Sequence, residues 1–305
     1  MITVRVPATS ANLGPGFDSI GLALDLWNEV SVARSSLPQI AISGEGEGRL
    51  ATDAANLAYR AVRVVANLAG ERGAFRLVLR NRIPLARGLG SSSAAIVGGL
   101  YAADRLLGGR LSTERLITLA ADLEGHPDNV AAALLGGLVI ACQASSGVTS
   151  ARLDAPRWPV VIGVPDEESA TRAARDRLPA RVSRADAVAN LSRSALLVAA
   201  VATGRHELLR EAMNDRLHEP YRRASVPGYD AIREAALAAG AWGVALSGAG
   251  PSILAFGPAA PVAAAMQEAY RQAGVSARVL QVRPSGTGVH LAPPADQGPT
   301  TPGEG

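Results

Sequence analysis

Lysine is missing from this chain of 305 residues, so all 30 of its Lys and Arg residues are arginine. A Schiff-base enzyme needs a lysine amine, and a Walker-type phosphate loop needs the lysine of its GK[ST] segment. The absence of lysine therefore excludes both of these classes of site.

Cysteine is almost as scarce, since Cys142 is the only one. A single cysteine excludes an intrachain disulfide and a cysteine metal cluster. The apolar run around it, residues 138–143, predicts that it packs in the core.

Charge runs and long hydrophobic runs are also lacking. The net charge is only +3 and no cluster of arginines occurs, so nothing indicates a nucleic acid as a partner. No apolar stretch approaches the length of a membrane span, and the opening residues lack a signal region. We therefore expect a soluble, cytoplasmic protein without membrane contact.

The residues that are present favour a globular protein with two domains, because 48% are hydrophobic and the chain is long enough. A polar, Pro- and Gly-bearing segment over 145–159 predicts a boundary, which gives domains over 1–155 and 156–291. Apolar periodicity in the second half predicts the order β-α-β-β-α-β, the split βαβ plan. The Pro- and Gly-rich tail, 292–305, is predicted to be disordered.

The most informative stretch is PLARGLGSSSAAIVGG, residues 84–99. It follows a strand-like alternation, contains Gly88 and Gly90, and continues into residues typical of a helix. Glycines let a phosphate approach the backbone, and the first turn of a helix offers free N–H groups at the positive end of its dipole. The stretch therefore predicts phosphate binding. The competing interpretation is an ordinary turn in which a serine caps the helix.

Other segments become informative beside this loop. The turn over 247–251, SGAGP, is either a plain hairpin connection or the far wall of a cleft that faces the loop. Glu124 ends a predicted helix, at the negative end of its dipole, and is either a solvated surface residue or a Mg²⁺ ligand. His126 has no second His or Cys near it, which argues against zinc. Asn129 could hold a hydroxyl nucleophile or cap a short helix.

Asn12 and Asp18 lie in a predicted turn-rich loop over 8–19. Turn formation alone explains Asn and Asp at such positions.

Thr171 and Arg175 are four residues apart and share one face of a predicted helix. Arg222 and Arg223 are adjacent near a second helix. Each arginine taken alone is expected at the surface. Two of them together could grip a carboxylate.

Taken together, these residues resemble the GHMP small-molecule kinases. Three segments carry the resemblance to the family's three motifs: 6–18, 84–94 and 246–252. Further segments are similar to the branch of the family that acts on L-homoserine: 124–129, 171–175 and 219–222. The order of these segments over residues 6–252 is highly specific.

The resemblance implies an α+β fold with two domains. The first would resemble domain 2 of ribosomal protein S5 and bind ATP, and the second would be ferredoxin-like. ATP and Mg²⁺ would bind in the cleft. The implied reaction is phosphorylation of the side-chain hydroxyl of L-homoserine to O-phospho-L-homoserine in threonine biosynthesis, and the implied assembly is a homodimer.

The same resemblance assigns roles by position. ATP would contact Pro84, Arg87, Gly88, Leu89, Gly90, Ser91, Ser92, Ser93 and Ala94. The metal ligands would be Ser92 and Glu124, with Ser91 and Ser93 as alternatives to Ser92. The catalytic residues would be Glu124, Asn129 and Thr171. The amino acid would be bound by Asn12, Asp18, His126, Asn129, Arg175 and Arg222.

Within that set, the two arginines suit the carboxylate of the substrate and Asp18 suits its ammonium group, and no convincing general base is present. Arg223 beside Arg222 leaves the carboxylate contact open by one position. One rival interpretation is a GHMP kinase with an isoprenoid or sugar substrate, against which the arginines and Asp18 argue. The other is a non-catalytic binding protein, against which Ser92, Glu124 and Asn129 argue.

Overall fold

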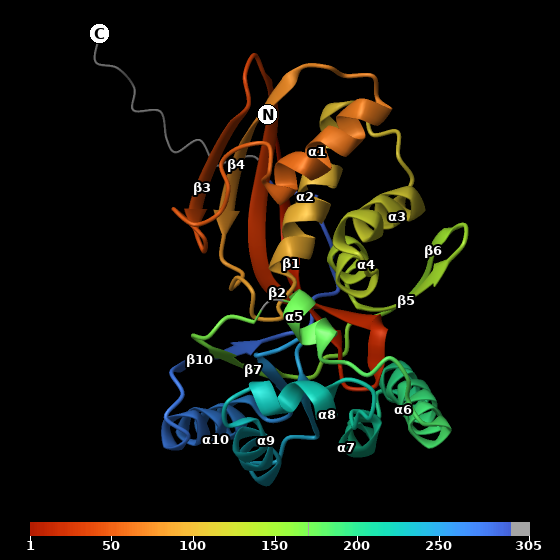
Figure 1. The fold of residues 1–305 in the computed structure, drawn as a ribbon, viewed down its shortest axis with the longest axis vertical. Coiled ribbons are helices and arrows are strands. Elements are labelled where there is room, and N and C mark those ends of the chain that lie inside the picture. The colour runs from red at the N-terminus through yellow and green to blue at the C-terminus, as the bar shows by residue number, and fades with distance from the viewer. Residues whose placement is uncertain (170, 294–305) are drawn as a thin grey trace.

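The computed structural model describes residues 1–169 and 171–293, with side-chain surroundings for all of these except 171–173. The strands form two sheets, one above the other in Figure 1, and helices pack against both. The predicted α+β fold with two such parts is confirmed. The tail predicted over 292–305 lies outside the described residues from 294 onward.

The larger sheet has the strand order β11-β1-β2-β4-β3, and β5 pairs with both β2 and β6. β2 pairs along its length with β1, β4 and β5, so it connects the whole sheet. The strands are β1 (Ile2–Asn12), β2 (Gly16–Ser35), β3 (Gln39–Gly44), β4 (Ala74–Asn81), β5 (Leu138–Ala144), β6 (Gly147–Leu153) and β11 (His290–Leu291).

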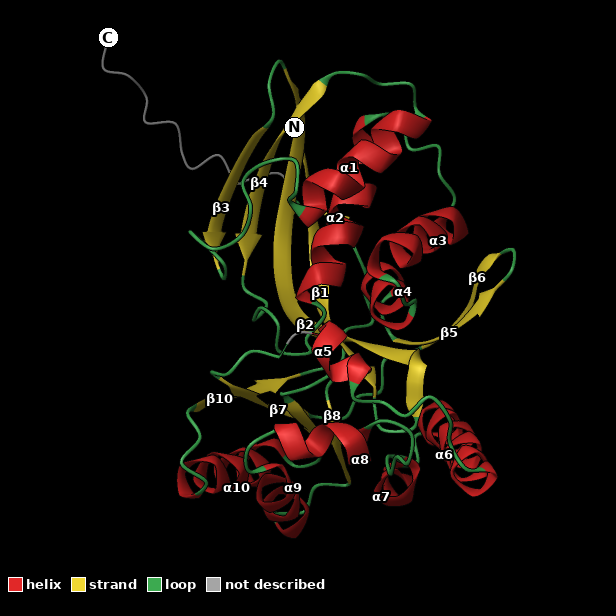
Figure 2. Cartoon of the chain, in the orientation of Figure 1, coloured by secondary structure: helices red, strands yellow, loops and turns green. Residues whose placement is uncertain are grey.

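One face of this sheet is covered by helices, as Figure 2 shows: α1 (Leu57–Leu68), α2 (Ser91–Leu106), α3 (Thr113–Glu124) and α4 (Asp128–Leu135). α2 packs closely on the sheet because Gly98 has no side chain, and a Cβ there would lie 2.6 Å from Val30 Cγ2. Ser112 caps α3 as predicted, accepting the N–H of Arg115. This packing brings the N-terminus of α2 to the lower end of the sheet in Figure 1.

The smaller sheet has the order β10-β7-β9-β8, with every neighbouring pair antiparallel. Its strands are β7 (Val160–Pro165), β8 (Gly243–Leu246), β9 (Ile253–Phe256) and β10 (Ala277–Val282). Helices α9 (Tyr229–Ala238) and α10 (Ala259–Gln272) pack on it with a core of their own. The order β7-α-β8-β9-α10-β10 is the split βαβ arrangement that the sequence predicts.

The remaining helices lie between β7 and α9 in the chain: α5 (Thr171–Asp176), α6 (Arg184–Thr203), α7 (Leu209–Ala212) and α8 (Glu219–Arg222). Short 3₁₀ turns occupy 206–208 and 223–225. By length and composition alone, α6 is long and apolar enough to cross a membrane. A single helix of this kind is weak evidence of a membrane span. The contacts of α6 with α7 place it beside the smaller sheet (Figure 1).

Two local predictions were wrong. The loop expected over 8–19 consists instead of the end of β1 and the start of β2, joined by a short turn at 13–15. Cys142 is exposed rather than in the core, because it lies in the part of β5 that extends beyond β2 and pairs with β6 alone, in a hairpin at the edge of the sheet (Figure 2). In addition, β11 pairs with β1 of the larger sheet, although it lies within the range predicted for the second domain.

Candidate active site

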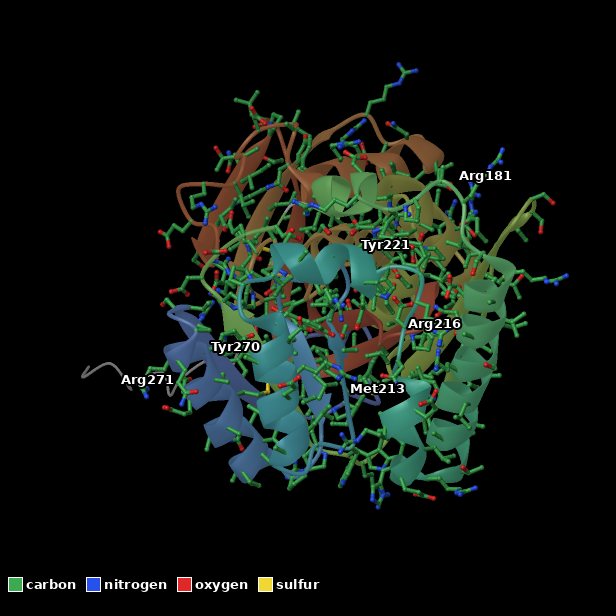
Figure 3. The ribbon with its side chains drawn as sticks, turned by 60° about the horizontal axis from the view of Figure 1, so that its bottom comes forward. Arg181, Met213, Arg216, Tyr221, Tyr270 and Arg271 are labelled. Atoms are coloured by element: carbon green, nitrogen blue, oxygen red, sulfur yellow. The ribbon has the colours of Figure 1, made fainter. Side chains whose placement is uncertain are left out.

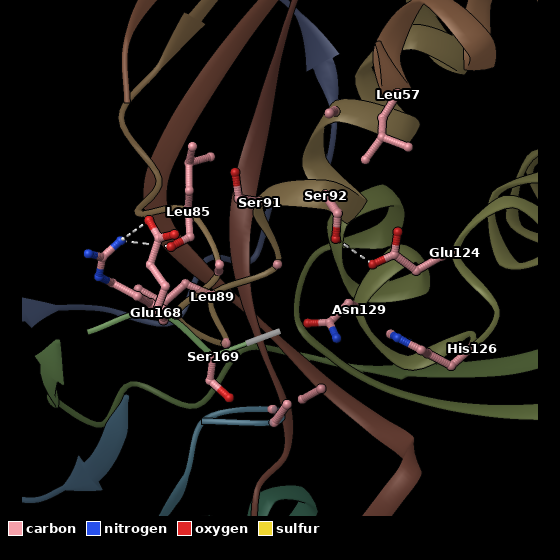
Figure 4. Close-up of a pocket in the computed structure, with 18 of the residues that line it drawn as sticks. Leu57, Leu85, Leu89, Ser91, Ser92, Glu124, His126, Asn129, Glu168 and Ser169 are labelled. Carbon is pink, nitrogen blue, oxygen red and sulfur yellow. Dashed lines mark hydrogen bonds and ion pairs between the residues drawn. The ribbon is translucent and has the colours of Figure 1, made fainter. Parts of the chain in front are cut away.

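A cavity of about 480 Å³ collects residues from elements of both sheets. Figure 4 shows its polar wall, which includes Ser92, Glu124, His126 and Asn129. Residues from the second half of the chain also line it, among them Glu168, Arg175, Arg222, Gly248 and Ala249. Most of the residues singled out in the sequence are therefore brought to one place.

The glycine-serine loop leads directly into α2. Gly90 is the N-cap residue, with φ +68°, and no side chain caps the helix. Ser91 is already the first helical residue, so the interpretation of a serine cap is wrong. The helix N-terminus lies at the cavity, where an anion would meet N–H groups and the positive end of the dipole.

Gly88 and Gly90 both allow a close approach that a larger residue would block. A Cβ on Gly88 would overlap the carbonyl oxygen of Ser247, and a Cβ on Gly90 would overlap the hydroxyl of Thr9. Ser247 Oγ donates to the Gly88 carbonyl at 2.7 Å. The turn over 247–251 is therefore the wall that faces the glycine-serine loop. This agrees with one of the two interpretations of the turn, as the far wall of a cleft.

The Glu124 carboxylate accepts hydrogen bonds from two serine hydroxyls at the start of α2. Ser92 Oγ and Ser93 Oγ donate to Glu124 Oε1 at 2.6 and 2.9 Å. Ser92 and Ser91 line the cavity, whereas Ser93 is fully buried. Among the described residues, no group of three or more His, Cys, Asp or Glu could hold a metal ion. A single carboxylate with a hydroxyl suits Mg²⁺, which is bound through few protein oxygens together with phosphates and water.

Asn129 is held by a buried network. Thr9 Oγ1 donates to Asn129 Oδ1 at 2.7 Å, and Asn129 Nδ2 lies 3.3 Å from Asp128 Oδ1. Asp128 Oδ1 also lies 2.8 Å from His126 Nδ1. Burial lowers the pKa of His126, but the hydrogen bond and charge of Asp128, with smaller effects of Glu124 and Asp18, outweigh burial and raise it. The network fixes which way the Asn129 amide points.

Asp18 and Arg175 form a two-pronged ion pair across the cavity, with Nη1–Oδ2 at 2.7 Å and Nη2–Oδ1 at 2.8 Å. Asp18 comes from β2 and Arg175 from α5, so the pair joins the two halves of the molecule. The hydrogen bond that Arg175 donates to Asp18 is the main cause of the raised pKa of Arg175. Each group is therefore a preformed counter-charge for the other.

The adjacent arginines have different surroundings. Arg222 is 2% exposed and lines the cavity, and its Nη1 donates toward Gly248 O at 3.3 Å. The Arg223 side chain is 54% exposed and lies 3.6 Å from Asp230. Burial lowers the pKa of Arg222, with a further contribution from the nearby charge of Arg175. Of the two arginines, Arg222 is the one at the cavity.

The other predicted site residues vary in their placement. Asn12 lines the cavity, and its amide donates to Gly248 O at 2.8 Å and accepts the Asp18 N–H at 3.1 Å. Arg87 lines it too, but its guanidinium is bonded to Pro165 O and lies 3.3 Å from Glu168. Gly88, Leu89 and Gly90 line the wall; Pro84, Ser93 and Ala94 are buried behind it. The Thr171 side chain lies outside the described part of the chain.

One end of the cavity is apolar, and the sequence did not indicate it. Its lining includes Val30, Leu50, Leu57, Leu79, Leu85 and Ala95. Figure 4 shows Leu57 and Leu85 on either side of Ser91. In the sequence, each of these residues is typical of an ordinary core or helix position. Only the fold shows that they line the same cavity. An apolar end next to an anion site suits a nucleoside.

Family models match both halves of the chain: the GHMP kinases N terminal domain over 56–137 and the GHMP kinases C terminal domain over 197–276. A homoserine kinase from Moorella thermoacetica is 47% identical over 94% of this chain and 99% of the relative. One from Carboxydothermus hydrogenoformans is 43% identical over 94% and 96%. The fold and the anion site at the N-terminus of α2 therefore define a small-molecule kinase. The chain belongs to the GHMP kinase family.

Solved structures agree with this assignment. A homoserine kinase from Cytophaga hutchinsonii superposes with a TM-score of 0.87 at 31% identity, covering 95% of this chain and 97% of that one. A protein described as a putative homoserine kinase from Listeria monocytogenes gives 0.78 at 33% identity, covering 96% and 100%. The similarity to the homoserine kinase branch therefore extends over nearly the whole chain. Mevalonate kinases at 12–15% identity share the fold alone.

Proposed function

We propose that this protein transfers the γ-phosphoryl group of ATP to the side-chain hydroxyl of L-homoserine, forming O-phospho-L-homoserine for threonine biosynthesis. The observation that carries this substrate is the charge arrangement opposite α2. Asp18, Arg175 and Arg222 offer one anion and two cations to a small zwitterion. The relatives and solved structures named homoserine kinase support the same reaction.

ATP binds with its phosphates along residues 88–93 and its nucleoside toward the apolar end of the cavity. The N-terminus of α2 stabilises the negative charge of the phosphates. Ser92 and Glu124 would hold Mg²⁺, because their oxygens lie 2.6 Å apart at the cavity wall. When bound, this ion supplies neutralisation of phosphate charge.

The amino acid binds by exchange with the ion pair. The substrate separates Asp18 from Arg175. Its ammonium group binds Asp18 and its carboxylate binds Arg175 and Arg222, so each charged side chain again has an opposite charge beside it. His126 and Asn12 complete this wall. The exchange leaves neither Asp18 nor Arg175 without an opposite charge.

Positioning carries most of the chemistry. Phosphoryl transfer proceeds through a loose transition state, so an aligned hydroxyl and neutralised phosphates lower the barrier without strong base catalysis. Because Thr9 occupies Asn129 Oδ1, the Asn129 amide nitrogen orients the attacking hydroxyl. The resemblance to the family assigns Thr171 to the same step, as a second hydroxyl.

The proposal is tested by a coupled ADP-release assay that compares L-homoserine, L-serine, L-threonine and mevalonate at saturating MgATP. We expect kcat/KM for homoserine to exceed that for each other substrate. Preference for mevalonate would identify a different GHMP kinase. Absence of turnover with every substrate would support a binding protein.

We propose that the enzyme acts in the cytoplasm as a homodimer, as its resemblance to the family implies. Size-exclusion chromatography with light scattering tests the assembly. A mass near twice 31.2 kDa is expected, and a mass of one chain would contradict it.

A further inference from the structure

His218 lies outside the set of residues that the sequence singled out, yet it sits directly behind the cavity. It precedes α8 and is fully buried. Its two ring nitrogens contact Gly14 and Arg222, one on each side. It therefore connects the turn between β1 and β2 to an arginine of the cavity wall.

The two contacts fix the tautomer of the imidazole. Nε2 lies 2.8 Å from the Gly14 carbonyl oxygen, which can only accept, so Nε2 carries the proton. Nδ1 lies 3.2 Å from Arg222 Nη1, which can only donate, so Nδ1 is the acceptor. Neutral His218 with its proton on Nε2 satisfies both partners, and no other form does.

The surroundings of His218 favour this neutral form. Burial lowers the pKa of His218, and the positive charge of Arg222 lowers it further, against the opposing effect of Asp215. Asp215 is already occupied, since its Oδ2 accepts the N–H groups of His218 and Glu219 at 2.7 and 2.6 Å. The Asp215 carboxylate therefore leaves the imidazole of His218 free to accept a hydrogen bond from Arg222.

Phe17 completes the support of the guanidiniums. Its ring stacks on His218 with centroids 5.3 Å apart and an interplanar angle of 25°. The guanidinium carbons of Arg222 and Arg175 lie 5.3 and 5.4 Å from the Phe17 ring centre. One aromatic platform thus orders both cations and the histidine.

The turn at 13–15 is itself clamped from the other side. A Cβ on Gly14 would overlap the Met213 carbonyl, and Ser194 Oγ donates to Pro15 O at 2.7 Å. Figure 3 labels Met213 and Arg216 on the stretch between α7 and α8 that packs here. Because Gly14 is held in place, the His218 ring it anchors is held as well.

We propose that His218 is a positioning residue that orients Arg222 for the carboxylate of the amino-acid substrate by accepting its Nη1–H at Nδ1. The inference rests on the proposed function, since it concerns the substrate of that reaction. A long arginine side chain loses rotational freedom on binding, and an acceptor that fixes it beforehand lowers this cost. The effect falls on amino-acid affinity and leaves ATP affinity unchanged.

Two isosteric variants separate the two nitrogens. In His218→Asn the amide oxygen takes the place of Nδ1 and keeps the acceptor for Arg222, while the contact with Gly14 is lost. In His218→Gln the amide nitrogen takes the place of Nε2 and keeps the contact with Gly14, while the acceptor is lost. Both variants remove the ring from Phe17, so each serves as the structural control for the other.

We expect His218→Gln to raise KM for L-homoserine by about tenfold or more, the effect of losing one hydrogen bond to a charged group. KM for ATP should stay constant. His218→Asn should keep KM for homoserine within about threefold of wild type. Calorimetric titration of homoserine into the ADP-bound enzyme should give the same order, and thermal melting reports stability separately.

Equal rises of KM in both variants, following their loss of melting temperature, would overturn the positioning role, because a structural histidine affects both alike. Wild-type enzyme without homoserine turnover would instead overturn the proposed function, and this inference with it. The two failures are therefore distinguishable in a single set of assays.

Discussion

At the scale of single residues, the site depends on side chains whose hydrogen-bonding capacity is already assigned by neighbours. The Thr9 hydroxyl occupies Asn129 Oδ1, and the Glu124 carboxylate accepts two serine hydroxyls. Such preorganisation matters in phosphoryl transfer, where small misalignments of the acceptor are costly. The neighbours that impose it are therefore as testable as the residues that face the substrate.

Thr9→Val removes the hydroxyl that orients the Asn129 amide and keeps the shape of the buried side chain. We expect kcat to fall by about tenfold, because the amide can then turn its oxygen toward the acceptor hydroxyl. Thr9→Ser keeps the hydroxyl and should stay near wild type. Steady-state kinetics with homoserine measures both, and equal kcat values in the two variants would contradict the assigned orientation.

Glu124→Gln removes the carboxylate charge at the α2 N-terminus while preserving its size. We expect kcat to fall by about two orders of magnitude or more, because a metal ligand and phosphate charge compensation are lost. The assay is repeated over a Mg²⁺ titration. Near-normal turnover at saturating Mg²⁺ would refute the metal assignment. Glu234→Gln, at an exposed position of α9, is the control.

At the scale of elements, the site is formed where two glycine-rich connections from different sheets meet. Gly88 packs on the Ser247 carbonyl, and the turn over 247–251 joins β8 to β9. Below it, Glu219 of α8 accepts the Leu246 N–H at 2.6 Å and so fixes the end of β8. These contacts position α8, the end of β8 and the glycine-serine loop together.

Gly88→Ala should disturb this meeting point, whereas Gly70→Ala is a matched control. The two glycines have φ of +69° and +72°, so alanine pays a similar backbone cost of about 1 kcal/mol at each. Only at Gly88 would the methyl group overlap a neighbour. We expect Gly88→Ala alone to lose a further 2 kcal/mol or so of unfolding free energy and most ATP affinity. Urea unfolding and ATP titration measure this, and equal losses would contradict it.

Glu219 makes stability depend on pH. Burial is the main cause that raises the pKa of Glu219 to about 7, so the native state holds its proton at pH values where the unfolded chain, near 4.5, has released it. The native state therefore binds more protons in this window, and the free energy of unfolding falls as pH rises through it.

Glu219→Gln cannot ionise, so the wild type should lose stability relative to this variant between about pH 5 and pH 8, by an amount on the order of 3 kcal/mol. Urea unfolding of both proteins across this range measures the difference. A stability difference that stays constant with pH, or that grows in favour of the wild type, would rule out the buried proton.

At the scale of the whole molecule, the sequence predicts well what is encoded by local pattern. The loop and helix at 84–99, the strand before them and the split βαβ order follow from periodicity and short motifs. The grouping of Glu124 with Asn129 follows from the resemblance to the family. Arg222 and Arg223 could not be told apart, because adjacent residues differ only in which way the short α8 turns them. The precise roles assigned to the site residues stay predictions.

What the sequence could not reveal depends on contacts between distant segments. Thr9 lies 120 positions from Asn129, and Gly14 lies 204 positions from His218. The apolar end of the cavity is likewise assembled from residues such as Leu50 and Leu85 that follow no motif. Cys142 was misplaced for a related reason, since burial of a strand depends on whether helices cover that part of the sheet.

The central claim, transfer of a phosphoryl group from ATP to the homoserine hydroxyl, is tested most directly by following a label. ATP carrying ¹⁸O in its γ-phosphoryl group is incubated with L-homoserine and Mg²⁺, and the products are resolved by mass spectrometry. The account predicts labelled O-phospho-L-homoserine in a one-to-one ratio with ADP, and its loss in Glu124→Gln. Labelled inorganic phosphate without labelled phosphohomoserine would contradict it.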